Sequence, residues 1–338
     1  MQRKDLLTEP VKHFRINSKL SVNQLIQQFQ NSGSFGAGRL AVACDIYEKM
    51  ARDKDCTIFL GLAGALVPAG MRSLIADLIR GGLINVVVST GANMVHDSIE
   101  ALGGHHYKGH WLMDDHVLYR YHVYRIYDVL VPEEDFVNLD YKMTAIYDDI
   151  ADQSKGKTLS SCDFARELGK RLEDPDSILR AAYESNVPVF LPAVRDSELG
   201  YVHFLHSTRR KLAKKPPLLL DAFSDVAEII GICRKSKKMG MIILGGGVPR
   251  NTIQSAALAT KSGLDYAVVI TMDRAETGGL SGSTLEETVS WGKVKGQAST
   301  VTVYGDAMII FPIMAASLIE RLGKNHKRPR PKNMEKLA

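Results

Sequence analysis

The sequence predicts an α/β protein built on a doubly wound, mostly parallel sheet with helices on both faces. Three observations lead to this fold class. Short apolar runs rich in β-branched residues alternate along the chain with amphipathic runs of helical period. The apolar runs are continuous rather than alternating with polar residues, which is typical of parallel strands buried on both faces. The 338 residues, 45% of them hydrophobic, are also enough for one large core.

The first part of the chain is predicted to lead into this pattern. Residues 1–20 read as an extended N-terminal arm. Ser21 is the N-cap signal for an amphipathic helix over Val22 to Phe29. The Gly- and Ser-rich stretch at 31–38 is expected to be a loop, and Arg39 to Asp53 is expected to be a helix because its apolar residues recur near a 3.6-residue period.

From residue 57 onward, strands and helices are predicted to alternate, so that 21–322 form a single α/β domain. In such sheets, ligands bind outside the carboxyl ends of the strands. The predicted strands are 57–63, 84–90, 188–194, 239–245, 266–271 and 300–304, and the predicted helices are 68–80, 93–102, 224–236 and 250–261.

Composition excludes several classes of protein. The net charge of +5 owes much to a basic tail, predicted to be a disordered and solvated end at 323–338 or a contact for an acidic partner. No nucleic-acid module is recognisable. The four cysteines form no CxxC pair, so no zinc site or disulfide framework is expected and a reducing cytoplasm fits best. The chain starts without a signal-peptide pattern and holds no apolar run of about 18 residues, so no membrane span is predicted.

The stretch from Leu264 to Pro312 holds the best candidate for chemistry. The run Gly278 to Gly282 favours a loop in which the backbone approaches another group closely. A short helix is expected next, with Ser283 or Thr284 as its cap. Lys293 follows beside a tryptophan and a glycine, where partial desolvation would make its amine a nucleophile. The alternative is an ordinary solvated lysine, which is the commoner fate of this residue type.

A set of motifs decides between these interpretations. SWGK at 290–293 is followed by VYGDA at 303–307, and FLGLAG, NVVVSTGAN, LVPEEDF, VPVFLPAVRDSELG and MIILGGGV precede them in order between 59 and 248. In content and spacing, these segments resemble the deoxyhypusine synthase family over nearly the whole chain. The resemblance implies a Rossmann-like NAD-binding fold and a homotetramer with active sites between paired subunits. It implies a transferase in which Lys293 captures the aminobutyl group of spermidine as an imine and passes it to an acceptor amine.

The resemblance also implies roles for individual positions, although glycine turns alone have ordinary structural explanations. Glu287 and Trp291 match residues of the polyamine pocket, where Trp291 would offer a cation–π surface. Asp196 matches a residue of the amine and cofactor site, and Tyr201 stands where the family has a polyamine-binding aspartate. The positions that match the NAD contacts, besides Asp196, are Thr90, Gly91, Ala92, Gly246, Gly247, Asp306 and Ala307.

Departures from the family pattern leave the substrate open. Asn251 and Thr252 replace a pair of histidines, one of them a proposed base, and Leu280 replaces an aspartate. His96 replaces a glutamate near NAD and is our candidate general base. It belongs to a His- and Asp-rich stretch that fits no metal-ligand spacing, so no metal is predicted. The acceptor is either a lysine of a translation-factor-like protein or a free amine such as putrescine, which would give homospermidine. The alternative function is a non-catalytic NAD-binding regulatory or scaffold protein.

Overall fold

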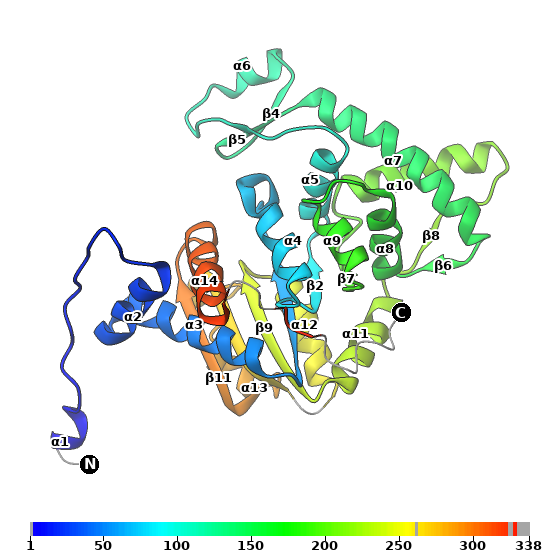
Figure 1. Cartoon of the computed structure of the whole chain (residues 1–338). Coiled ribbons are helices and arrows are strands. Elements are labelled where there is room, and N and C mark those ends of the chain that lie inside the picture. The colour runs from blue at the N-terminus through cyan, green and yellow to red at the C-terminus, as the bar shows by residue number, and fades with distance from the viewer. Residues whose placement is uncertain (1–2, 261–262, 324–326, 330–338) are drawn as a thin grey trace.

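A six-stranded parallel sheet forms the centre of the molecule in a computed structural model that describes residues 3–260, 263–323 and 327–329 (Figure 1). Its strand order is β11-β10-β9-β1-β2-β7. Numbered along the chain within this sheet, the order is 6-5-4-1-2-3, that of the doubly wound dinucleotide-binding fold. The strands are β1 (Cys56–Leu62), β2 (Val86–Ser89), β7 (Val189–Phe190), β9 (Lys238–Leu244), β10 (Leu264–Thr271) and β11 (Val294–Tyr304). The predicted fold class is therefore confirmed.

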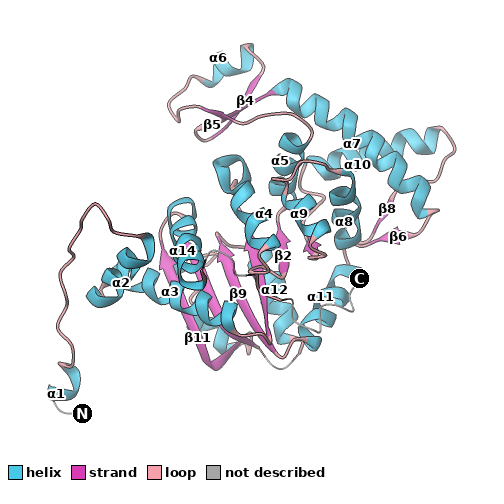
Figure 2. Cartoon of the chain, in the orientation of Figure 1, coloured by secondary structure: helices cyan, strands magenta, loops and turns pink. Residues whose placement is uncertain are grey.

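Side chains on the two faces of the sheet belong to two separate cores. Ile58, Leu60 and Leu62 of β1 face one core, whereas Phe59 between them faces the other, as the two-residue period of a strand requires. The first core includes α2 (Val22–Ser32), α3 (Phe35–Arg52), α4 (Arg72–Arg80) and α14 (Ala307–Leu322). The second includes α11 (Ser224–Lys235), α12 (Val248–Leu258) and α13 (Leu285–Ser290). Figure 2 shows helices on both sides of the magenta strands.

A second region lies between β2 and β9 in the chain and above the sheet in Figure 1. A small antiparallel sheet of β3 (Tyr107–Lys108), β5 (Val129–Pro132) and β4 (Val123–Ile126) lies near α6 (Asp115–Arg120). A two-stranded parallel pair, β6 (Thr158–Leu159) and β8 (Leu219–Leu220), forms farther along the chain. The helices of this region are α5 (Gly91–Ala101), α7 (Glu133–Ser154), α8 (Ser161–Arg171), α9 (Ile178–Glu184) and α10 (Glu198–Leu212).

Several predicted bounds differ from the structure; for example, the strand expected at 300–304 starts earlier, at Val294. The expected loop at 31–38 is reduced to two residues, because α2 runs to Ser32 and α3 already starts at Phe35. Gly38 permits this: a Cβ there would lie 2.5 Å from the backbone of Gly33, so only glycine lets the two helices come so close. The strand expected at 188–194 is only two residues long, and Pro192 follows it, which cannot donate to a ladder.

The beginning and end of the chain have less regular structure. A short helix, α1 (Arg3–Leu6), precedes an exposed segment without regular secondary structure up to Ser21, whose side chain caps α2 as predicted. Most of the tail expected to be solvated at 323–338 falls outside the described residues, but Arg328 is buried instead, at 5% exposure. No helix among the described residues is both long and apolar enough to cross a membrane.

Candidate functional site

The glycine turn between β9 and α12 is at the centre of the carboxyl edge of the sheet. Gly245 and Gly247 have φ values of 82° and 77°, which favour glycine. A Cβ on Gly246 would lie 1.9 Å from the Ser281 side chain, so the loop after β10 packs directly on the turn. A Cβ on Gly247 would meet nothing within 4 Å. The backbone of Gly247 is therefore open to a ligand at the point where the strand order reverses.

The other predicted cofactor residues lie along the same edge. Thr90 is the N-cap of α5 after β2, and Gly91 is packed so tightly that a Cβ would lie 2.3 Å from Ser197 Oγ. Asp306 caps α14 after β11 and accepts a hydrogen bond from the Met308 N–H at 2.8 Å. Ala92 and Asp306 are exposed, whereas Ala307 is half-buried. Asp196 is also exposed and lies in the turns between β7 and α10. These helix starts leave backbone N–H groups at the edge, as anion-binding sites require.

Lys293 lies just before β11, at the end of that strand opposite to this edge, but its side chain reaches toward the edge. Its backbone carbonyl pairs with the Leu264 N–H at the start of β10. Its side chain runs along α12, where Nζ donates to Asn251 Oδ1 at 3.3 Å. The ring centre of Trp291 lies 5.3 Å from the same nitrogen. Asn251 is one helical turn from Gly247, whose carbonyl accepts the Asn251 N–H. The structure thus brings the amine of Lys293 near the glycine turn.

The segment that carries Lys293 is fixed to α12 by a buried guanidinium. Arg250 is fully buried and donates from Nη1 to the carbonyls of Leu280 at 2.7 Å and Ser283 at 3.0 Å. Burial lowers the pKa of Arg250 to about 10, against the opposing charge of Glu287. Thr284 caps α13 by accepting the Glu287 N–H, which confirms one of the two expected caps. Glu287 is exposed, and Trp291 is 63% exposed in the single chain.

A hollow of about 600 Å³ opens next to Asn251. It lies at the carboxyl edge, among the loop after β7, the start of α11 and the first turns of α12. Its lining includes Arg195, Asn251 and Thr252. Arg195 directly precedes Asp196, which was predicted to contact the cofactor. Its wall is mostly apolar, and its residues are Pro192, Val194, Arg195, Ala222, Phe223, Asp225, Val226, Ile229, Ile230, Asn251, Thr252, Ser255 and Ala256.

His96 is not part of this group within one chain. It is in α5, which packs into the first core, whereas Asn251 and Lys293 border the second. Four strand spacings of about 4.8 Å, or about 19 Å, separate β2 from β11. His96 Nδ1 instead lies 2.9 Å from His106 Nε2, and His106 Nδ1 lies 2.6 Å from Glu100 Oε1. Burial, with the charge of His106, lowers the pKa of His96 to about 4 despite Glu100. This favours a neutral imidazole.

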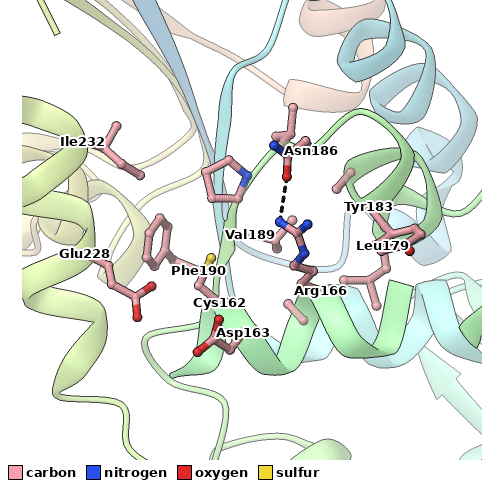
Figure 3. A pocket seen from close by; sticks show the side chains of 14 residues that line it. Cys162, Asp163, Arg166, Leu179, Tyr183, Asn186, Val189, Phe190, Glu228 and Ile232 are labelled. Carbon is pink, nitrogen blue, oxygen red and sulfur yellow. Dashed lines mark hydrogen bonds between the residues drawn. The ribbon is translucent and has the colours of Figure 1, made fainter. Parts of the chain in front are cut away.

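A smaller cavity of about 220 Å³ lies beside β7, and it contains none of the predicted residues (Figure 3). Arg166 points across it and donates to Asn186 Oδ1 at 2.6 Å. Burial raises the pKa of the Cys162 thiol, which argues against a reactive cysteine there. Among the residues that the structure describes, no three His, Cys, Asp or Glu side chains are placed to hold a metal ion.

The sequence analysis missed two residues of the site, and the structure places a second predicted residue, besides His96, apart from it. Arg250 and Arg195 were not singled out, although an arginine three residues after a glycine triplet, at a helix start, is an available signal. No local pattern indicates that Arg195 lines a hollow beside Asn251. Tyr201 is on α10 and 54% exposed, and it does not line the hollow.

Comparisons with known proteins agree on one family. A family model described as deoxyhypusine synthase matches residues 24–318. A Methanosarcina thermophila protein named "Probable deoxyhypusine synthase" is 45% identical over 319 residues, which are 94% of this chain and 97% of that protein. A Methanosarcina acetivorans protein named "Probable deoxyhypusine synthase 1" is 46% identical over 318 residues, with the same coverage of 94% and 97%.

A solved structure agrees on the fold. The crystal structure of a "putative deoxyhypusine synthase from Entamoeba histolytica" superimposes with a TM-score of 0.65 at 18% identity, covering 95% of this chain and 100% of that chain.

Proposed function

The chain belongs to the deoxyhypusine synthase family, whose members are transferases, and on that premise we propose that it transfers the aminobutyl group of spermidine, or of a similar polyamine, through Lys293 to an acceptor amine, with NAD as cofactor. One observation supports this most directly. The amine of Lys293 reaches Asn251, one helical turn from the open backbone of Gly247. A single chain therefore holds a nucleophilic amine close to the sheet edge at which dinucleotides bind in this type of fold.

The carboxyl edge fits NAD. The strand order reverses between β1 and β9, and Gly247 leaves open space at that point. Thr90 to Ala92 and Gly246 to Gly247 would contact the cofactor, as would Asp196 and the pair Asp306 and Ala307. Bound NAD would supply the acceptor and donor of hydride. The chain's own part is to hold the Lys293 amine next to this edge and to exclude water, because water would hydrolyse a lysine imine.

The donor amine has a cation-binding face on the Trp291 side of Lys293. Trp291 offers an aromatic ring next to the Lys293 amine. Glu287, four residues earlier in α13, offers an exposed carboxylate. Lys293 would attack the oxidised donor carbon, release the diaminopropane part and hold the aminobutyl group as an imine. An acceptor amine would then displace Lys293, which regenerates its free amine. The acceptor is a lysine of a translation-factor-like protein or a free amine such as putrescine.

A homotetramer with active sites between subunits would complete this site. Trp291, Val289 and Leu258 are apolar side chains near Lys293, exposed at 63%, 39% and 38% in the single chain. A second subunit over this surface would remove Lys293 from water, as an imine mechanism requires. A general base such as His96, which the single chain keeps apart from Lys293, would then have to come from another subunit. Cysteines that are all free thiols among the described residues suit a reducing cytoplasm.

A borohydride trap tests this proposal. The full chain is incubated with NAD and spermidine labelled in its aminobutyl part, reduced, and mapped by peptide mass. We expect label on Lys293, none in Lys293→Arg, and unchanged label in Lys295→Arg, a neighbouring lysine that pairs with Asp265 at 2.6 Å. A chase with putrescine or with an acceptor protein, before reduction, identifies the acceptor. Absence of label in a protein that binds NAD would leave the non-catalytic NAD-binding protein as the better account.

A further inference from the structure

The Lys293 amine has two different neighbours, and they border two different surfaces. Trp291 lies on one side of it and has an exposed aromatic ring. Asn251 lies on the other and belongs to the wall of the 600 Å³ hollow. If the Trp291 side binds the donor, as in the proposed function on which this inference rests, the hollow is free for the other substrate.

The wall of the hollow suits a hydrocarbon chain better than a polycation. Phe223 and Val226 are exposed at 87% and 55%, and they line the hollow together with Val194, Ile229 and Ile230. Such side chains bind methylene groups by removing apolar surface from water. They offer no acceptor for an ammonium group, which would lose hydration on entering.

The two charged residues of the wall, Asp225 and Arg195, indicate which charge the ligand should carry. Asp225 is 4% exposed, and its two carboxylate oxygens already accept from the Ser161 N–H at 2.8 Å and from Ser161 Oγ at 2.5 Å. Burial raises the pKa of Asp225 as well, which weakens it further as a partner for a cation. Arg195 is exposed, and within the described residues its guanidinium makes no hydrogen bond or ion pair. The free charge at the hollow is therefore positive.

We propose that this hollow binds the acceptor as a primary amine with an apolar chain and an anionic end such as a carboxylate, its amine toward Asn251 and its anion toward Arg195. A guanidinium is the side chain best matched to a carboxylate, since its N–H groups pair with both oxygens. Putrescine, the free amine named as a possible acceptor above, is disfavoured in this position because it is a dication, so this inference narrows a free-amine acceptor to one with an anionic end. Its second ammonium would meet Arg195 rather than a free carboxylate.

Three five-carbon amines test separately what the apolar chain and the anionic end contribute to binding. Isothermal titration of the full chain uses 5-aminopentanoate, pentylamine and cadaverine, which differ in the group at the far end. We expect 5-aminopentanoate to bind at least about tenfold tighter than cadaverine, with pentylamine between them. Arg195→Glu should invert the order of 5-aminopentanoate and cadaverine and leave pentylamine within about twofold. Lys214→Glu, at an exposed lysine in the turn after α10, should leave all three unchanged.

Several outcomes would overturn the inference. Cadaverine binding most tightly, an order that Arg195→Glu does not change, or no measurable binding of any probe would each do so. The titration needs neither NAD nor transfer, so it is separate from the trap on Lys293. Label on Lys293 with the amine order reversed would refute only this inference. The expected order without label would refute only the proposed transfer.

Discussion

Asn251 accepts a hydrogen bond from the amine of Lys293, with Oδ1 and Nζ 3.3 Å apart, although the two residues are 42 positions apart in the chain. This contact joins the glycine turn after β9 to the segment after α13. It also restricts the Lys293 side chain, which would otherwise sample many rotamers. The resemblance stated above implies a histidine at this position in the better-known pattern of the family, so a neutral amide would replace a possible base.

Asn251→Ala should slow the labelling of Lys293 without abolishing it. The variant loses a hydrogen bond that orients the free amine and is worth about 1 kcal/mol, which corresponds to about fivefold in rate. Single-turnover trapping at several quench times measures this rate. Asn31→Ala, at an exposed asparagine at the end of α2, should label at the unaltered rate. Equal rates in the two variants would contradict a positioning role for Asn251.

Arg250→Ala should destabilise the protein and release the loop that carries Leu280 and Ser283. Two carbonyls lose their donor, and the removed side chain leaves space in a buried position, which together cost about 2–4 kcal/mol. Urea unfolding followed by circular dichroism measures the free energy. Arg234→Ala, at an exposed arginine of α11, should stay within about 0.5 kcal/mol. A loss in Arg250→Ala as small as in this control would refute the clamp.

The buried neutral His96 should make folding sensitive to acid. Its pKa of about 4 in the folded chain is below its unfolded value of about 6.5. The unfolded state therefore binds the proton first as the pH falls, and stability is lost between about pH 6.5 and 4. The full loss is about 3 kcal/mol, at 1.36 kcal/mol for each pKa unit.

The measurement compares the pH dependence of unfolding in three proteins. His96→Asn should lose less stability than the unaltered chain when the pH falls from 7 to 4.5. His105→Asn, at an exposed histidine of the same stretch, should follow the unaltered chain. Parallel curves for all three would mean that His96 is not a buried neutral group.

Local pattern explains why the sheet and its edge were predictable. Strands of a parallel sheet are buried on both faces, so β1, β9 and β10 stand out as continuous apolar runs. The glycines after β9 mark the carboxyl edge because the chain turns there at positive φ. The matched motifs extend this to the identity of the family.

Features that depend on tertiary packing, such as the face of the sheet on which a helix packs, were not predictable in the same way. His96 follows a strand end, as Asn251 does, but α5 and α12 pack on opposite faces of the sheet. No one-dimensional pattern records that difference. The strands β3 and β6 have only two residues each, too few to show a period. The burial of Arg250 and the free charge of Arg195 depend on residues about 30 positions away or more.

Arg328 is a buried charged residue, although it belongs to the stretch 323–338 that was expected to be solvated. Its guanidinium donates to the carbonyls of Asp53 at 2.6 Å and Cys56 at 2.5 Å, and to Asn85 Oδ1 at 2.9 Å. A Cβ on Gly82 would lie 2.3 Å from the Arg328 carbonyl, so the backbone also fits closely.

Arg328→Ala should therefore lower the free energy of unfolding by about 3 kcal/mol, since buried acceptors at the start of β1 lose a charged donor. Lys327→Ala, at the exposed neighbour, should change it by less than about 0.5 kcal/mol. Urea unfolding of both variants decides the matter. Equal stability would show that the Arg328 side chain contributes nothing to the fold, whereas the expected difference would mean that Arg328 stabilises the first strand of the sheet.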